Sequence, residues 1–415
     1  MRRQATVGVL ADATSDENFC RSVVEGIGTG AEIKTERGMV RLSATQMYPQ
    51  LRGDPASPLT ISQTAGQSSN TTIRVGDMFF LKFYRRLQSG INPEVEIGRY
   101  LTEVVRFPNI VPVAGFAEYR NSEGTPVTLA LLQAFVMNQG DGWDYTVNYL
   151  TRFLEERRTA VALAEDAHGA YLELVKTLAT RTAELHRALS TPSADEAFSP
   201  EPIKEQDLAA WRLNVRADAE KTLEMLAQRA PQLPAAVIPE VDTLLSRREI
   251  LLKRIDASVP GPLRGLKTRY HGDYHLGQVL LKRNDFIIVD FEGEPGRPLA
   301  ERRMKQSPLR DVAGMLRSFT YARWTGMQRC TVQSAEDCGR WDALLDKWES
   351  DVKSMFIATY DAIARPAGIY QSLEEVQSLL RLFEIEKALY ETRYELGNRP
   401  DWASIPLRSL NAFTQ

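Results

Sequence analysis

The sequence contains little cysteine and little histidine, and this scarcity limits the metal and disulfide sites that it can build. Its three cysteines, Cys20, Cys330 and Cys338, are too few and too scattered for a disulfide framework or a zinc site. Only four histidines occur among the 415 residues. We therefore expect any bound metal ion to be held by oxygen ligands.

The sequence also lacks an excess of charge and a long apolar run. Lysine and arginine number 51 against 54 aspartate and glutamate residues, a formal charge of −3, which excludes a general nucleic-acid binder or a polybasic membrane binder. No apolar run approaches the roughly 18 residues that a membrane span needs. The stretch from Val7 to Ala11 is too short for a signal peptide. We expect a cytoplasmic protein without a nucleic-acid or membrane partner.

What is present is an ordinary globular composition, with 43% apolar residues, in a length that corresponds to two or three domains. The pattern predicts an N-terminal cap subdomain over residues 1–60, a β-rich lobe over 61–138 and a mostly helical lobe over 139–415. This order indicates an α+β fold with two lobes.

Local patterns predict several elements within these lobes. Residues 70–84 form a hairpin around Gly76-Asp77, a two-residue loop typical of a II′ turn. Asn92 caps a helix that begins with Pro93 and is expected to reach about residue 106. A second strand pair is expected between residues 111 and 136. The other predicted elements are helices over 144–190, over 201–256 and from 307 to the end, and a hairpin over 278–291.

The strongest chemical signal is His271-Gly-Asp-Tyr-His-Leu-Gly-Gln278, followed by a strand that ends in Asp290-Phe-Glu292. Phosphoryl transfer uses such a set, because one carboxylate orients the attacking hydroxyl and accepts its proton. An amide oxygen and a second carboxylate then hold Mg²⁺ against the nucleotide phosphates. A lone His-x-Asp would indicate only a solvated loop, but the full string beside a hairpin favours phosphoryl transfer.

The string resembles the HGDxHxxN signature of the aminoglycoside-phosphotransferase and choline-kinase branch of the protein-kinase-like fold. The resemblance implies a bilobal fold with Asp273 as the catalytic base and Asp290 as a Mg²⁺ ligand. Two positions depart from the signature, since Gln278 replaces Asn and Asp290-Phe-Glu292 replaces Asp-Phe-Gly. We expect Gln278, Asp290 and Glu292 to form the metal site.

A kinase-like fold also requires a strand lysine paired with a glutamate on the following helix. Lys82 lies in the apolar run Phe79–Phe83, and both Glu94 and Glu96 lie on the next predicted helix. Glu96 is the favoured partner, because the pattern that follows it better matches the family.

The phosphate-binding loop is expected in the polar segment before Lys82, and the hinge under the adenine in the strand 129–136. No GxGxxG motif is present. The residues expected to contact ATP in these two segments are Ser68, Ser69, Asn70, Gln133, Phe135 and Val136.

Longer strings, among them Leu81–Leu87, Gly90–Leu101 and Asn398-Arg-Pro-Asp-Trp402, are similar to the maltokinase family from about residue 60 to the C-terminus. This resemblance implies transfer of the ATP γ-phosphate to the anomeric hydroxyl of maltose. It also implies a functional link to trehalose synthase and to α-glucan (glycogen) synthesis. A glucosamine or other sugar kinase, an aminoglycoside phosphotransferase and a nucleotide-binding pseudokinase remain alternatives.

The last long helix is expected to bind the sugar. Leu373, Val376, Leu380 and Phe383 recur at helical spacing and predict a core stripe. A second, polar stripe begins at Lys387. Its expected sugar ligands are Glu391, Tyr394, Glu395 and Asn398, with Tyr390, Trp143 and Trp402 as further aromatic platforms. The alternative is a solvated stripe with ion pairs such as Lys387–Glu391.

Three further features have expectations of their own. His271 is expected to fix the loop around Asp273, and His186 to pack within its helix. Asp311 is expected either to cap its own helix or to brace the same loop. The basic run Arg297, Arg302, Arg303 and Lys305 is expected to be a solvated loop that could meet phosphate.

Overall fold

The computed structural model describes residues 11–63, 70–157, 168–259, 261–329 and 335–415. The chain forms two compact units. The first contains residues 1–137 and 288–303, and the second contains residues 138–287 and 304–415.

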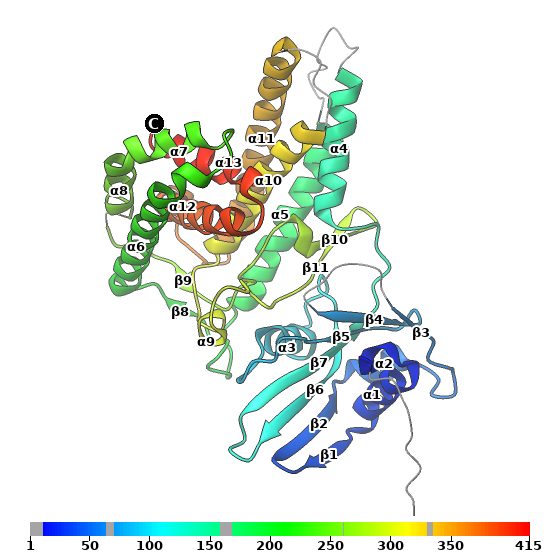
Figure 1. Ribbon diagram of the computed structural model, residues 1–415. Helices are drawn as coiled ribbons and strands as arrows, with labels where there is room; N and C mark the ends of the chain where they lie inside the picture. Colours follow the sequence, from blue (N-terminus) through cyan, green and yellow to red (C-terminus); the bar gives the residue numbers. More distant parts are fainter. Residues whose placement is uncertain (1–10, 64–69, 158–167, 260, 330–334) are drawn as a thin grey trace, which may run out of the picture. The chain divides into compact units, whose positions relative to one another are not determined.

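The first unit is built on a seven-stranded antiparallel sheet with the order β1-β2-β6-β7-β5-β4-β3 (Figure 1). The strands are β1 (Glu32–Thr35), β2 (Gly38–Ala44), β3 (Ile61–Gln63), β4 (Thr71–Val75), β5 (Phe79–Phe83), β6 (Val113–Asn121) and β7 (Pro126–Ala134). The helical elements are η1 (Ala13–Ser15), α1 (Glu17–Thr29), α2 (Met47–Arg52), α3 (Pro93–Arg99), the π-helix η2 (Tyr100–Val104) and α9 (Leu299–Arg302).

The two faces of strand β5 have different neighbours, because successive side chains of a strand point to opposite faces. Phe79 and Leu81 belong to a core that also contains Val24 and Ile27 of α1. On the opposite face, Lys82 precedes Tyr84, which packs in a second cluster with Val95 of α3 and residues of β6 and β7. Lys82 is therefore directed to the face that carries α3.

Residues 11–60 do not form a separate cap. Strand β2 pairs along its length with β6, and Cys20, Val24 and Ile27 of α1 share a core with β4 and β5. Residues 288–303, predicted in the helical lobe, belong to the first unit. The sequence pattern did not indicate either contact, because both join segments that are distant in the chain.

The predicted hairpin and helix of the first unit are present, with two differences. Val75 pairs with Phe79, so the β4–β5 loop contains three residues and the predicted two-residue turn is wrong. Asn92 Oδ1 accepts the N–H of Glu94 at 2.8 Å, which confirms the predicted cap. The α-helix ends at Arg99 and continues only as the π-helix η2.

The second unit is mainly helical (Figure 1). Its longer helices are α4 (Gly142–Arg157), α5 (Gly169–Leu189), α6 (Glu205–Arg229), α7 (Ile238–Ser246), α8 (Arg248–Asp256), α10 (Leu309–Arg329), α11 (Ala335–Ala364), α12 (Leu373–Asn398) and α13 (Ser404–Ala412). The shorter elements are η3 (Ala230–Gln232), η4 (Leu276–Gln278), η5 (Pro400–Ala403), the pair β8 (Glu201–Pro202) and β9 (Leu266–Lys267), and the pair β10 (Val279–Lys282) and β11 (Asp285–Ile288).

Helix α10 is the central element of this unit, since it packs against α4, α11 and α12, while α12 also packs against α6. Val376, Leu380 and Phe383 of α12 are buried, which confirms most of the predicted core stripe. The α+β fold class with a β-sheet lobe and a helical lobe is confirmed. Among the described residues, no helix combines the length and apolarity needed to cross a membrane.

Candidate active site

Lys82 of β5 lies among three carboxylates of the first unit. Its Nζ is 2.9 Å from Glu94 Oε2, 2.8 Å from Asp290 Oδ1 and 2.5 Å from Glu292 Oε1. Carboxylate oxygens of the three acids lie within 4.8 Å of one another. Such oxygens are the ligands that Mg²⁺ prefers, so this cluster could hold both a phosphate-binding ammonium group and a metal ion.

The glutamate that pairs with Lys82 is Glu94, and the prediction of Glu96 is wrong. Glu94 lies in the first turn of α3, where it is 2% exposed and also accepts the Tyr84 hydroxyl at 2.5 Å. Two residues further along a helix, a side chain points about 200° away. Glu96 accordingly makes a bidentate pair with Arg303, at 2.9 and 2.6 Å.

The cluster perturbs the pKa values of its members. Burial raises the pKa of Glu94 to about 7, because the opposing charge of Lys82 is countered by Asp290 and Glu292. Burial lowers the pKa of Lys82, but the three neighbouring carboxylates reverse this effect and hold the pKa well above its usual value. Lys82 is therefore a fixed cation at neutral pH.

The segment that carries Asp290 and Glu292 is held by backbone contacts of the first unit. The Ile288 N–H donates to the Asn109 carbonyl at 2.8 Å, and Ile288 forms a parallel bridge with Ile110. Asp290 has φ +66°, a left-handed conformation that is uncommon outside glycine. Such backbone persists only where the surroundings enforce it, as they do in many functional sites.

The predicted nucleotide contacts are placed only in part. Ser68 and Ser69 lie outside the described residues. Asn70 Nδ2 donates to Glu292 Oε1 at 3.1 Å, which brings the end of the predicted phosphate loop to the carboxylate cluster.

In the predicted hinge, Gln133 pairs with Phe80 of β5 and Val136 follows the end of β7. The Phe135 N–H donates to the Met78 carbonyl at 2.8 Å. That N–H is therefore engaged within the first unit, and the expectation that backbone around Gln133 to Val136 pairs with the adenine stays a prediction.

In the second unit, the loop that carries Asp273 is fixed by buried groups. Both oxygens of Asp311 accept backbone N–H groups, from His271 at 2.7 Å and from Gly272 at 2.9 Å. His271 Nδ1 in turn accepts the Asp273 N–H at 3.3 Å. The expectation that His271 and Asp311 brace this loop is confirmed. Gln278, the predicted amide ligand, closes η4 in the same unit.

Behind the loop, His186 connects Asp311 to a tyrosine. His186 Nε2 lies 3.1 Å from Asp311 Oδ2, and His186 Nδ1 lies 2.8 Å from the Tyr360 hydroxyl. Because a carboxylate only accepts hydrogen bonds, Nε2 is the nitrogen that donates a proton to Asp311. The packed role predicted for His186 is thus correct, but it includes support of Asp311.

A residue that the sequence did not single out contacts the candidate base. Lys387 Nζ of α12 lies 3.0 Å from Asp273 Oδ1, and both side chains are about one-fifth exposed. The sequence signal was the position of Lys387 at the start of the polar stripe, where an ion pair with Glu391 was the alternative. That alternative is wrong, because Glu391 pairs with Arg317 of α10 at 2.6 Å.

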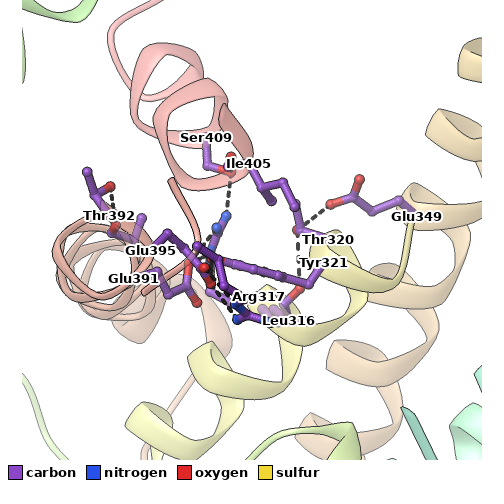
Figure 2. A network of polar contacts seen from close by, with 12 residues as sticks. Leu316, Arg317, Thr320, Tyr321, Glu349, Glu391, Thr392, Glu395, Ile405 and Ser409 are labelled. Atoms are coloured by element: carbon purple, nitrogen blue, oxygen red, sulfur yellow. Dashed lines mark hydrogen bonds and ion pairs between the residues drawn. The ribbon is translucent and has the colours of Figure 1, made fainter. Parts of the chain in front are cut away.

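Figure 2 shows that the carboxylates of the polar stripe are engaged within the protein. Arg317 lies between Glu391 and the Ser409 hydroxyl of α13. Glu395 is 2% exposed and binds Arg399 at 2.8 and 3.0 Å. Both carboxylates were expected to accept hydrogen bonds from sugar hydroxyls. In the structure, each is instead paired with an arginine.

Among the aromatic residues expected to bind the sugar, Tyr394 is the exposed one. Tyr394 is 48% exposed and stacks on Tyr390, with ring centroids 6.4 Å apart. Lys387 lies over the Tyr390 ring, and Arg399 lies over the Trp402 ring at 4.7 Å. Asn398 Nδ2 donates to the Tyr394 carbonyl at 2.8 Å. Tyr394 is thus the exposed aromatic side chain of α12, and Lys387 and Arg399 cover the rings of Tyr390 and Trp402.

The curated relatives of this chain include two proteins named glucosamine kinase. One, from Mycolicibacterium smegmatis, is 26% identical over 86% of this chain and 78% of its own length. The other, from Streptacidiphilus jiangxiensis, is 25% identical over 82% of this chain and 70% of its own length.

A solved structure described as glucosamine kinase in complex with glucosamine, ADP and inorganic phosphate has the same fold. It is 20% identical, covers 95% of this chain and 83% of its own, and has a TM-score of 0.67. The family model of the phosphotransferase enzyme family (APH) matches residues 60–344, a span that contains Lys82, Asp273 and Asp290. The chain belongs to this phosphotransferase enzyme family.

Proposed function

We propose that the protein is an ATP- and Mg²⁺-dependent sugar kinase. The observation that carries the proposal is the pair of prepared sites: Lys82 among three carboxylates in the first unit, and Asp273 braced beside Lys387 in the second. Phosphoryl transfer depends on positioning and on electrostatic stabilisation, and these two sites supply the groups for both.

Each group has a distinct role in the proposed reaction. Lys82, held by Glu94, binds the phosphates of ATP. Asp290 and Glu292 would hold Mg²⁺, which would neutralise phosphate charge. Asp273 accepts the proton of the acceptor hydroxyl, whose oxygen bonds to the γ-phosphorus while the bond to the bridging oxygen of ADP breaks.

Glucosamine is the first candidate for the acceptor. Two curated relatives, each aligned over more than four-fifths of this chain, carry the name glucosamine kinase. That agreement supports a sugar as acceptor and favours an amino sugar over an aminoglycoside.

Maltose, phosphorylated at its anomeric hydroxyl to give maltose 1-phosphate, is the second candidate. The long strings similar to maltokinases support it, and so does the exposed ring of Tyr394 on α12, which suits the apolar face of a sugar ring. Glu391 and Glu395 are neutralised by Arg317 and Arg399, so the stripe offers little to an ammonium group. A link to trehalose synthase and to glycogen synthesis follows only if maltose is the acceptor.

A coupled assay of ADP release tests both candidates. The purified chain with Mg²⁺ and ATP is assayed with glucosamine, maltose, glucose, trehalose and kanamycin. Turnover on glucosamine or maltose supports the proposal, and a maltose product that no longer reduces identifies the anomeric position. Turnover on kanamycin alone, or nucleotide binding without turnover on any sugar, would contradict it.

A further inference from the structure

The basic run Arg297, Arg302, Arg303 and Lys305 contains one cation, Arg302, that has no carboxylate partner among the described residues. Three of its four members pair with acids: Arg297 with Glu294, Arg303 with Glu96 and Lys305 with Glu201. Arg302 instead donates to neutral acceptors only, the carbonyls of Arg297 and Glu292 and the side-chain oxygen of Gln88. Burial lowers the pKa of Arg302, and the nearby charge of Arg86 adds to that effect although Glu292 opposes it.

Arg302 and Arg86 both line a cavity of about 180 Å³ that lies within the first unit. Arg86 forms no hydrogen bond or ion pair with any residue in the described ranges. Thr128 of β7 lines the same cavity, and its hydroxyl is buried without a partner in the part of the chain that the structure describes. Buried polar atoms of this kind are rare, and each indicates a missing partner.

These groups share one chemical preference. Two guanidinium groups and a hydroxyl donate hydrogen bonds, and guanidinium groups match the geometry of phosphate oxygens. Glu292 also lines the cavity and would repel an anion, but its carboxylate is compensated by Lys82 at 2.5 Å and by Asn70. The cavity is therefore a cationic pocket with unsatisfied donors.

We propose that this cavity binds a phosphate-type oxyanion, separately from the nucleotide, between Arg302 and Arg86 with Thr128 as a third donor. The bound anion would act on the active site through Arg302, because Arg302 Nη1 also holds the Glu292 carbonyl at 3.2 Å. The proposal does not rest on the identity of the acceptor sugar or on turnover.

Titration of the purified protein with inorganic phosphate by calorimetry tests the site. We expect Arg302→Gln to weaken phosphate binding at least tenfold and Arg86→Gln to weaken it several-fold. Arg120→Gln, an exposed arginine of β6 in the same unit, should bind phosphate as the wild type does. Equal binding by all four proteins would overturn the proposal.

Thr128→Val separates loss of the site from loss of folding. The substitution removes a hydroxyl that has no hydrogen-bond partner among the described residues, so the thermal midpoint without phosphate should not fall. Phosphate binding should nevertheless weaken several-fold. Unchanged phosphate binding by this variant would show that Thr128 does not contact the anion, and it would overturn the site as proposed.

Phosphate titration in the presence of saturating Mg²⁺ and a non-hydrolysable ATP analogue distinguishes a site for a free anion from a site for the terminal phosphate of the nucleotide. Unchanged affinity for inorganic phosphate supports a separate site. Competition would show that the cavity receives the terminal phosphate of the nucleotide, and it would overturn the separate site while leaving the kinase proposal intact.

Discussion

The choice between Glu94 and Glu96 shows how much depends on the direction of one side chain. The two glutamates are two residues apart on α3, yet one lies in the buried cluster and the other in a partly exposed pair with Arg303. Removing one partner of a buried ion pair costs about 3–5 kcal/mol, whereas a partly exposed pair contributes about 1 kcal/mol or less.

Matched substitutions at these positions should therefore differ strongly. We expect Glu94→Gln to lower kcat/KM for ATP about 10²-fold, because the buried carboxylate that positions the Lys82 ammonium is lost. Glu96→Gln should change it less than about threefold. Steady-state kinetics with varied ATP measure both values. The same loss in both variants would contradict the assignment of Glu94.

A second prediction for single residues follows from the contact between Lys387 and Asp273. Lys387 orients the candidate base, so Lys387→Met should lower kcat about tenfold or more and leave KM for ATP nearly unchanged. Asp273→Asn should lower kcat about 10²-fold or more, since general-base help is worth about 10²–10⁴. Lys387→Arg should restore part of the activity.

The exposed Lys347, which pairs with Asp351 on α11, provides the control, and Lys347→Met should retain wild-type kcat. If Lys387→Met raises KM for ATP and acceptor equally without a change in kcat, Lys387 has no positioning role.

At the scale of elements, the loop that carries Asp273 depends on how closely helix α10 approaches it. A Cβ atom on Gly314 would lie 2.6 Å from the Tyr274 carbonyl oxygen, so only glycine permits the observed distance. The same helix supplies Asp311 and Ser318, whose hydroxyl accepts the Leu276 N–H at 3.0 Å. Contacts with helix α10 thus fix the conformation of the loop that carries Asp273.

We expect Gly314→Ala to displace the loop, with a loss of about 1–3 kcal/mol in stability and a fall in kcat of at least tenfold. Gly339 of α11 offers the control, because a Cβ atom there meets nothing within 4 Å. Gly339→Ala should stabilise the protein by about 0.5–1 kcal/mol without affecting kcat. Thermal unfolding and steady-state assays measure both effects, and wild-type kinetics in Gly314→Ala would show that α10 does not fix the loop.

At the scale of the whole molecule, the sequence predicted what local patterns determine. Periodicity and turn chemistry within short windows predicted helix α12, the cap at Asn92, the β4–β5 hairpin and the β6–β7 strand pair. The proposed roles of Asp273 and Asp290 come from a motif and stay predictions. The pairing of β2 with β6 and the contact of Lys387 with Asp273 were not predictable, because each joins segments far apart in the chain without a local signal.

The acid stability of the molecule provides a last prediction, since Glu349 joins α10 to α11. It accepts hydrogen bonds from Thr320 at 2.5 Å and from Arg323 at 3.0 Å, and it pairs with Lys353 at 2.7 Å (Figure 2 shows the Thr320 contact). Burial alone would raise the pKa of Glu349, but Lys353, Thr320 and Arg323 lower it to about 2 from 4.5. The group therefore binds protons more weakly in the folded state.

Because the unfolded state binds more protons, this contribution is present above about pH 4.5 and is lost as the pH falls toward 2. The difference between the two pKa values corresponds to about 3 kcal/mol. Urea unfolding at several pH values between 7 and 3 should show that Glu349→Gln is strongly destabilised at pH 7 and progressively less so, relative to the wild type, toward pH 3. A difference in unfolding free energy that stays constant over this range would mean that the ion pairs of Glu349 do not link α10 to α11 electrostatically.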